Sequence, residues 1–280
     1  MNVPFTVMAL TLCWCFAAHA MESQKRYVIS HDDVTIDVID EGNGPLMVLL
    51  PSAGRDSEDY DKVAEGLAMA GFRVLRPQPR GAGKSTGLKE GITLHDLAND
   101  VALTIENAQD GQAIIVGHAF GNWVARMTAV DHPELVRGVV IAAAASKDYP
   151  KDLLVSLRDA GNVALPDQQR LAALRIAFFA PGNDPSIWLT GWHPKIAAYQ
   201  RPIIASPKEQ EWWSGGSAPL LDLQALQDPF RPRSTANDIK AEFGDRVTIA
   251  TVANASHALI PEQPVSVVAA IVTWAKTLKP

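Results

Sequence analysis

The residues best placed to do chemistry form a glycine-flanked turn in the middle of the chain. Gly117-His118-Ala119-Phe120-Gly121 follows a short apolar run and opens a helical pattern. A G-x-S-x-G segment in this strand-turn-helix setting forms a strained turn that presents its central side chain, and its glycines relieve backbone crowding. The central residue here is Ala119. The motif therefore predicts a site built for nucleophilic chemistry whose nucleophile position carries only a methyl group.

Alternating strands and helices must position this turn. Short runs rich in Val, Ile and Leu, too short for helices, are separated by longer helical patterns. Strands are expected at Leu46–Leu50, Val74–Leu75, Ala113–Val116, Val139–Ala145, Leu220–Leu226 and Val247–Val252, and helices at Glu58–Met69, Leu94–Asn107, Phe120–Val130 and Pro264–Leu278. This order predicts an α/β fold with a mostly parallel sheet covered on both faces, which binds ligands at the carboxyl ends of its strands.

Two local patterns refine this expectation. Arg26–Ser30 and Val34–Ile39 alternate apolar and polar residues, which predicts an antiparallel hairpin at the edge of the sheet. Thr93 directly precedes a helical pattern and is the predicted N-cap.

The alternation of short apolar runs with helical stretches stops between residues 146 and 218, where the pattern is helical throughout. We interpret 146–218 as an inserted helical cap and 21–145 with 219–280 as the core. The insertion holds four of the seven tryptophans, an apolar concentration suited to covering a ligand: Trp188, Trp192, Trp212 and Trp213. Whether each of them covers a ligand or only fastens the insertion to the core stays open.

The order of these segments resembles the capped branch of the α/β-hydrolase fold family. Leu223–Pro232 is similar to the family's G-x-x-D-x-x-x-P segment, with Ala225 at the glycine position, and the resemblance implies that Asp228 is the acid. Asn254–Glu262 is similar to the family's G-x-x-H loop and implies that His257 is the base. In these roles the acid holds the imidazole in one tautomer, and the base takes or gives the proton.

Two further turns fit the same resemblance. Leu49–Gly54 stands where the family has its oxyanion turn, which implies that the backbone N–H groups of Ala53 and Phe120 converge on a developing negative charge. Arg80–Ser85 matches the family's R-G-x-G-x-S turn, with Gln78 where an Asp is usual. That segment contains the G-K-S of a phosphate-binding P-loop, but Gln78 stands where the P-loop needs its first glycine, so no phosphate site is expected.

Ala119 is the departure from the family's pattern. Family hydrolases carry Ser, Cys or Asp at this position, and a methyl group cannot attack a substrate, so the acyl-enzyme route is closed. Loss of the serine from a protease triad costs roughly 10⁶ in kcat. By the family resemblance, Ser52 carries the one hydroxyl expected within reach of the site. The alternative interpretation is that this hydroxyl only stabilises a turn or caps a helix. His118 is expected to pack beneath the end of the sheet.

Three hypotheses of function stay open. In the first, the His257–Asp228 dyad acts without a serine nucleophile, activating water against a small apolar ester, lactone or carbonyl substrate or removing a proton from it. In the second, the chain is a non-catalytic binder of a small molecule. In the third, it is an inactivated serine esterase or lactonase. The scaffold alone does not decide between them, because it hosts many reactions.

Composition narrows the class of partner. The chain has 280 residues, of which 47% are hydrophobic and 20% charged, with a net charge of −6. The hydrophobic content excludes a disordered chain. The negative net charge excludes the positive field that attracts nucleic acid, so a small-molecule substrate or ligand is expected. The remaining histidines show no metal-ligand spacing such as H-E-x-x-H, so neither a metal nor a cofactor is expected.

The first twenty residues predict export. Met1–Ala20 carries no Asp, Glu, Lys or Arg, is apolar from Val7 to Ala18, and ends in an A-x-A cleavage pattern. The apolar run is short for a membrane span of ~20 residues, so we expect a cleaved signal peptide, a periplasmic or secreted protein and no stable membrane anchor, with an uncleaved anchor as the alternative. Cys13 and Cys15 lie inside this segment, so the mature chain would form no disulfide.

Overall fold

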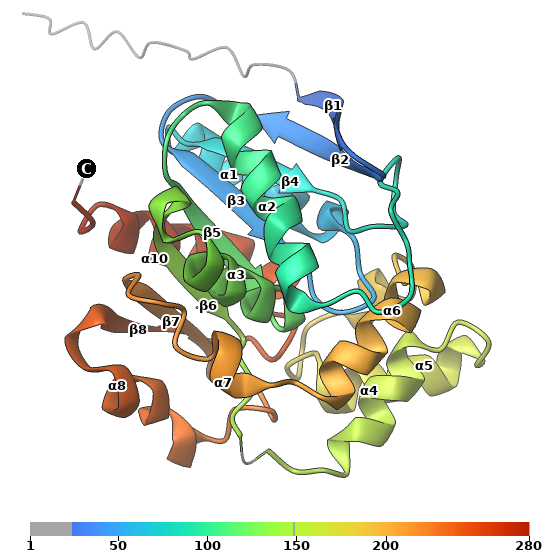
Figure 1. Ribbon diagram of the computed structural model, residues 1–280. Coiled ribbons are helices and arrows are strands. Elements are labelled where there is room, and N and C mark those ends of the chain that lie inside the picture. The colour runs from blue at the N-terminus through green and yellow to red at the C-terminus, as the bar shows by residue number, and fades with distance from the viewer. Residues whose placement is uncertain (1–23, 148, 280) are drawn as a thin grey trace, which may run out of the picture.

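An eight-stranded sheet forms the centre of the computed structural model, which describes residues 24–147 and 149–279 (Figure 1). The strands are β1 (Lys25–His31), β2 (Val34–Glu41), β3 (Leu46–Leu50), β4 (Arg73–Pro77), β5 (Ala113–His118), β6 (Val136–Ala142), β7 (Leu220–Ala225) and β8 (Val247–Val252). Their order across the sheet is β1-β2-β4-β3-β5-β6-β7-β8. The pairs β1–β2 and β2–β4 are antiparallel, and the pairs from β4 to β8 are parallel. The predicted fold class and edge hairpin are therefore confirmed.

Helices cover both faces of the sheet. They are α1 (Asp61–Met69), α2 (Leu94–Ala108), α3 (Phe120–Asp131), α4 (Leu153–Gly161), α5 (Asp167–Ala177), α6 (Pro194–Ala205), α7 (Glu209–Trp212), α8 (Asp238–Phe243), α9 (Leu259–Glu262) and α10 (Pro264–Ala275). Alternate residues of β3 explain the two layers: Val48 belongs to the apolar cluster that contains α2 and α3, whereas Met47 and Leu49 belong to the one that contains α1 and α10. Because both faces of β3 are buried, its sequence is a continuous apolar run.

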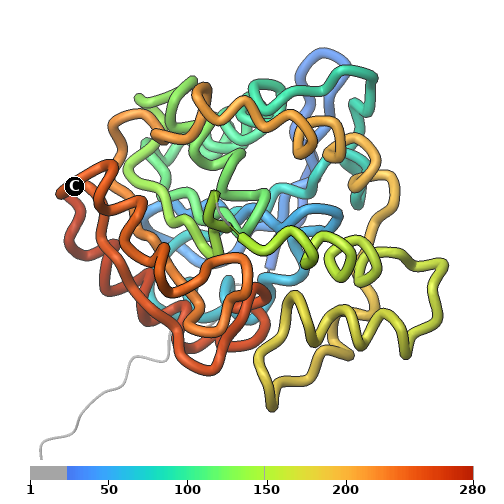
Figure 2. Tube along the Cα trace, turned by 90° about the horizontal axis from the view of Figure 1, so that it is seen from below, coloured from blue at the N-terminus to red at the C-terminus, as the bar shows by residue number. Residues whose placement is uncertain are grey.

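Four helices, α4 to α7, lie between β6 and β7, inside the range 146–218 predicted for the insertion. Figures 1 and 2 both show α4, α5 and α6 gathered at one end of the sheet. Side chains of α4, α5 and the segment after α5 form a separate apolar cluster around Leu174, Phe178 and Trp188, which also includes Phe230 of the core. Ile203 of α6 belongs instead to the cluster that contains α2 and α3. Apolar side chains from the core thus attach the insertion to the end of the sheet.

The observed elements differ from the predicted ones mainly at their ends. β6 stops at Ala142 rather than Ala145, because Ala143 has a positive φ of 48° and the chain leaves the sheet there. The helix expected from Glu58 begins with a 3₁₀ turn at Ser57–Tyr60 and becomes α-helical at Asp61. The predicted signal peptide, residues 1–20, lies outside the described residues. Within residues 24–147 and 149–279, no helix combines the length and apolar character needed to cross a bilayer.

Helix α2 begins with the predicted N-cap. The Thr93 hydroxyl accepts the backbone N–H of Asp96 at 3.2 Å, and the Asp96 carboxylate accepts the backbone N–H of Thr93 at 2.9 Å. Two N–H groups that the helix itself cannot satisfy are therefore paired in a capping box.

We expect Thr93→Ala to lower the free energy of unfolding by about 1 kcal/mol, because the first turn of α2 loses its side-chain acceptor. Urea unfolding followed by circular dichroism measures the change. Ser234→Ala, at an exposed position, is the matched control and should leave the unfolding free energy unchanged. Equal stability of Thr93→Ala and the parent would show that the cap contributes nothing.

Candidate active site

The turn between β5 and α3 is a strained elbow centred on Ala119. This residue has φ 48° and ψ −111°, a conformation that L-residues rarely adopt. Its backbone N–H donates to the carbonyl of Ala142 at 3.0 Å. A Cβ on Gly117 would overlap the backbone of Gly121, and a Cβ on Gly121 would overlap the carbonyl oxygen of Leu50. Both glycines are thus required by the close approach of three backbone segments.

Asp228 and His257 come together as a hydrogen-bonded pair. Nδ1 of His257 lies 2.9 Å from Oδ2 of Asp228, and both residues are only 5% exposed. The other carboxylate oxygen, Oδ1, accepts the backbone N–H of Phe230 at 2.8 Å. Since a carboxylate accepts, we assign the imidazole proton to Nδ1, which leaves the lone pair of Nε2 available as a base.

His118 connects this pair to the elbow. Its Nε2 lies 2.6 Å from the backbone carbonyl oxygen of His257, and the two imidazole centroids are 5.9 Å apart. Because a carbonyl oxygen only accepts, Nε2 of His118 must carry the proton and donate it. The residue that precedes Ala119 in the chain therefore holds the backbone of the candidate base.

The loop that carries His257 is fixed on both sides. The backbone N–H of Ser256 donates to Oε2 of Glu262 at 2.6 Å, and the N–H of Ala258 donates to the carbonyl oxygen of Phe178 at 2.8 Å. The second oxygen of Glu262 accepts the N–H of Ala180 at 2.7 Å. The same carboxylate thus ties the loop to the segment that follows α5.

Aromatic side chains surround the His257 imidazole. The ring centroid of Phe230 lies 4.5 Å from it and that of Phe178 lies 5.7 Å from it. The Trp188 ring packs 5.3 Å from Phe178 and 5.8 Å from Trp192. Such a low-dielectric enclosure strengthens the hydrogen bond between the imidazole and its carboxylate partner.

The turn after β3 lies against the start of α3 and is bonded to the insertion. The backbone N–H of Gly54 donates to Oε1 of Gln200 at 2.8 Å, and the carbonyl oxygen of Gly54 accepts the N–H of His193 at 2.8 Å. Ala53 lies in this turn and Phe120 is the first residue of α3. These bonds hold the turn after β3 to the insertion, and the close approach of Gly121 to the Leu50 and Pro51 carbonyl oxygens brings the start of α3 beside the end of β3.

Comparison with known proteins identifies the family. The profile of the alpha/beta hydrolase fold matches residues 45–193, more than half of the chain. The chain belongs to this family. It is 26% identical over 239 residues, 84% of each chain, to a 2-(acetamidomethylene)succinate hydrolase of Mesorhizobium japonicum. It is also 33% identical over 99 residues, 35% of this chain and 28% of the relative, to epoxide hydrolase B of Mycobacterium tuberculosis.

Solved structures share the fold of this α/β-hydrolase. An esterase from Exiguobacterium antarcticum superposes with a TM-score of 0.73 at 15% identity, over 87% of this chain and 96% of the esterase. An alpha/beta hydrolase from Novosphingobium aromaticivorans superposes with a TM-score of 0.70 at 19% identity, over 92% of this chain and 99% of that chain. At these identities the likeness concerns the fold.

The four tryptophans of the insertion fall into two separate clusters. Trp188 and Trp192 lie with the rings near His257, as described above. Trp212 instead stacks on Trp123 of α3 at 4.7 Å, and the Arg126 guanidinium lies 4.6 Å from the Trp213 ring. Trp212 and Trp213 thus fasten the insertion to α3, which was the alternative interpretation of these residues.

Several residues of the site escaped the sequence analysis. Phe178 and Phe230 frame the imidazole, and Arg55 stacks on both nearby tryptophans, 4.5 Å from Trp188 and 4.8 Å from Trp192. Phe178 and Arg55 lie outside the quoted motifs, and Phe230 fills a variable position of the G-x-x-D-x-x-x-P segment, so each meets the site through tertiary packing. Ser52 is buried in the turn after β3. In the described part of the chain, no three His, Cys, Asp or Glu side chains are grouped as metal ligands.

The His118 imidazole is fully buried and neutral. Burial, followed by the nearby charge of His257, lowers its pKa from 6.5 to about 3. Its Nδ1 has no hydrogen-bond partner among the described residues. Below pH 6.5 the unfolded chain therefore binds a proton at this residue that the folded chain excludes, so the contribution of His118 to stability falls as the pH falls.

We expect the free energy of unfolding contributed by this residue to drop by about 3 kcal/mol between pH 7.5 and pH 4.5, from the two pKa values. The measurement is the difference in unfolding free energy between the parent and His118→Gln at each pH, with exposed His31→Gln as the control. The His118→Gln difference should shrink or reverse at pH 4.5. A difference independent of pH would contradict a neutral, buried imidazole.

Proposed function

We propose that this α/β-hydrolase acts on a small apolar ester, lactone or carbonyl substrate through the His257–Asp228 dyad, without a serine nucleophile. The observation that carries the proposal is the buried 2.9 Å contact between the His257 imidazole and the Asp228 carboxylate. The backbone carbonyl of His257 is in turn bonded to His118, the residue before Ala119. A positioned base alone contributes roughly 10²–10⁴-fold to a rate. The hydrolases among the relatives support the reaction class.

The reaction that fits this arrangement is direct attack by water. Nε2 of His257 removes a proton from water as its oxygen bonds to the substrate carbonyl carbon, and the carbonyl oxygen takes the negative charge. Backbone N–H groups of Ala53 and Phe120 are the proposed donors to that oxygen. As the carbonyl re-forms, the leaving group departs and receives the proton from His257. Asp228 stabilises the imidazolium that exists between the two proton transfers.

Ala119 is the reason for proposing water as the nucleophile. Its methyl group occupies the elbow position, where it neither attacks a carbonyl nor hydrogen bonds to the imidazole. The Ser52 hydroxyl lies in the neighbouring turn, and that residue is only 6% exposed. We therefore assign Ser52 a structural role in the turn and no covalent step.

A second candidate function is binding of a small apolar molecule without turnover. The observation that favours it is the enclosure of His257 by Phe178 and Phe230 beside a position that lacks a nucleophile. In that case the dyad is a satisfied hydrogen-bonded pair. A ligand that co-purifies with the protein, together with no turnover by the parent, would favour this alternative.

We expect His257→Ala to reduce turnover of an activated short-chain ester by roughly 10²–10⁴-fold, because the base is lost. Initial rates are measured with p-nitrophenyl acetate, and circular dichroism checks that the variant is folded. His257→Gln provides a second, less disruptive variant, and His31→Ala, at an exposed histidine, is the matched control. A parent rate that persists in both His257 variants would remove the dyad from the mechanism.

We expect Ala119→Ser to raise the rate on the same ester by roughly 10²-fold or more, since loss of a triad serine costs roughly 10⁶. A fluorophosphonate probe should label Ala119→Ser and leave the parent unlabelled, as read by intact-protein mass spectrometry. Labelling of the parent at Ser52 would show that this hydroxyl is a nucleophile after all. Absence of both labelling and activity in folded Ala119→Ser would support the binding alternative.

A further inference from the structure

An aspartate interrupts the apolar core inside strand β7. Asp222 is the third residue of this strand and is fully buried, since β6 and β8 flank it on either side. A buried carboxylate costs free energy unless it is paired, and an apolar side chain of similar volume often serves the stability of a fold as well or better. A role of Asp222 other than stability is therefore to be sought in what it binds.

Arg231 is the ionic partner of this carboxylate. Its Nη2 lies 3.0 Å from Oδ2 of Asp222, and its Nη1 donates to the carbonyl oxygen of Ala144 at 3.4 Å. The side-chain amide of Gln224, on the same face of β7, donates to the same oxygen of Asp222 at 2.7 Å. Arg231 is itself buried, so the pair joins two segments of the core away from water.

Arg231 also ends the tight turn that carries the candidate acid. The carbonyl oxygen of Asp228 accepts the backbone N–H of Arg231 at 3.1 Å, and Pro229 follows Asp228, where its fixed φ favours such a turn. Within the turn, Oδ1 of Asp228 accepts the backbone N–H of Phe230 at 2.8 Å. The carboxylate is thus fixed relative to its turn. The position of the turn on the core then determines how Oδ2 meets the His257 imidazole.

The two ends of this turn are held in different ways. The near end follows the sheet directly, because β7 ends at Ala225, three residues before Asp228. At the far end, the carbonyl oxygen of Phe230 accepts the N–H of Ser146 at 2.9 Å, but Ser146 lies outside the helices and strands. The Arg231 side chain returns from this far end to β7 itself. It therefore connects the far end of the turn to the sheet.

We propose that Arg231 is a positioning residue for the acid, which fastens the turn to Asp222 and so keeps Oδ2 of Asp228 against Nδ1 of His257. Arg231 acts through Asp228 and takes no part in proton transfer. This inference rests on the proposed function only where turnover is measured, because the contact between Asp228 and His257 exists whether or not a substrate is converted.

Replacing both members of the pair separates positioning from stability. Removing Arg231 alone leaves Asp222 as a buried unpaired charge, which destabilises the fold whatever else the pair does. Buried Arg126 is attracted by Asp222 and repelled by Arg231, so these two effects on it oppose each other when both charges are removed. The double variant Asp222→Leu with Arg231→Met therefore loses the connection without leaving an unpaired charge from the pair.

A low-field proton NMR signal reports the dyad independently of turnover. The Nδ1 proton of His257, bonded to a carboxylate and buried, should give this signal in the parent, and His257→Gln should identify it by removing it. We expect folded Arg231→Met and the double variant both to lose the signal. In thermal unfolding by circular dichroism, Arg231→Met should melt below the parent and the double variant closer to it.

A signal that persists in the folded double variant would overturn the proposal, because the pair would then serve stability alone. If Arg231→Met does not fold, the double variant decides. Loss of the signal from a double variant that melts close to the parent would support positioning, since lost stability could not explain it.

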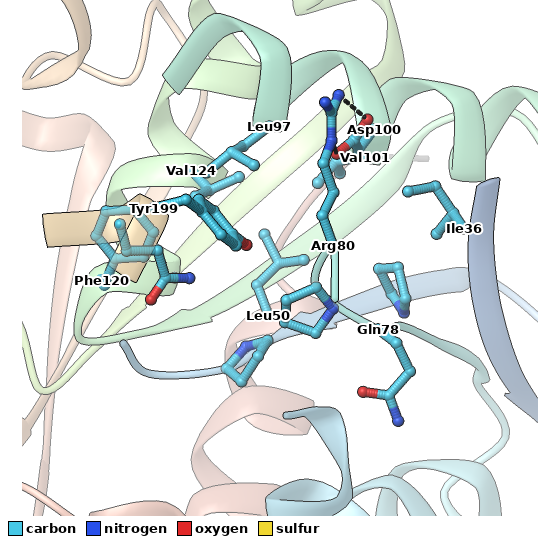
Figure 3. A pocket seen from close by; sticks show the side chains of 15 residues that line it. Ile36, Leu50, Gln78, Arg80, Leu97, Asp100, Val101, Phe120, Val124 and Tyr199 are labelled. Atoms are coloured by element: carbon cyan, nitrogen blue, oxygen red, sulfur yellow. Dashed lines mark hydrogen bonds and ion pairs between the residues drawn. The ribbon is translucent and has the colours of Figure 1, made fainter. Parts of the chain in front are cut away.

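A second buried pair provides the matched control. Nε and Nη2 of Arg80 lie 2.7 and 2.8 Å from the two carboxylate oxygens of Asp100 (Figure 3). This pair fastens the turn after β4 to α2 and has no bond to the turn of the acid. Arg80→Met should therefore melt below the parent and keep the His257 signal. Loss of the signal in folded Arg80→Met would show that breaking any buried pair disturbs the dyad, and would overturn the proposal.

Initial rates with p-nitrophenyl acetate connect positioning to catalysis. A catalytic group misplaced by about 1 Å can cost roughly 10²-fold in rate, so we expect kcat of the double variant to fall roughly 10- to 100-fold with little change in KM. If the parent converts no ester, the proposed function fails and the NMR signal alone decides the role of Arg231. An unchanged kcat together with a lost signal would support positioning by Arg231 and remove the dyad from the mechanism.

Discussion

The contact of three backbone segments around Ala119 is the constraint on which the site depends. Gly117 and Gly121 have no room for a Cβ, so the start of α3 packs directly against the carbonyl end of β3. Ala119 is held at a positive φ, a strain of about 1–3 kcal/mol that persists only where surrounding packing enforces it. That packing is the buried apolar layer between α3 and the sheet. The free energy gained by burying this layer offsets the local strain at Ala119.

Burial also determines the electrostatics near the elbow. His118 stays neutral because desolvation disfavours its charged form, and its protonated nitrogen then holds the carbonyl oxygen of His257. Asp228 remains satisfied because His257 and the backbone of Phe230 donate to its two oxygens. A buried carboxylate without such donors would cost several kcal/mol. The imidazole and carboxylate are thus kept in one arrangement by hydrogen bonds that water does not compete for.

The insertion is attached to the core at two aromatic clusters with different consequences. Trp188 and Trp192 stack with Arg55, beside the rings that frame His257. Trp212 and Trp213 pack on α3 with Arg126, where burial lowers the pKa of that guanidinium to about 9. Helix α6 lies between these attachments in the chain, and its Gln200 side chain accepts the backbone N–H of Gly54 in the turn after β3. One insertion therefore contributes to the aromatic enclosure and also holds the turn after β3.

Local patterns were sufficient to predict much of this molecule. The alternation of short apolar runs and helical stretches predicted the layered α/β fold, because strands buried on both faces must be continuously apolar. Thr93 predicted its helix start, and Gly117 and Gly121 predicted the elbow, since each of these depends on residues close in sequence. The pairing of Asp228 with His257, twenty-nine positions apart, followed from the family resemblance and agrees with the observed contact.

Contacts between distant segments were decided only by the tertiary structure. The division of the tryptophans into two clusters, the support of His257 by His118 and the bond of Gln200 to the turn after β3 all join segments far apart in the chain. The end of β6 at Ala142 was likewise missed, because the apolar composition continues beyond the point where the backbone turns away. The apolar character of a side chain predicts that it will be buried. Which residue it then contacts depends on how helices and strands pack in three dimensions.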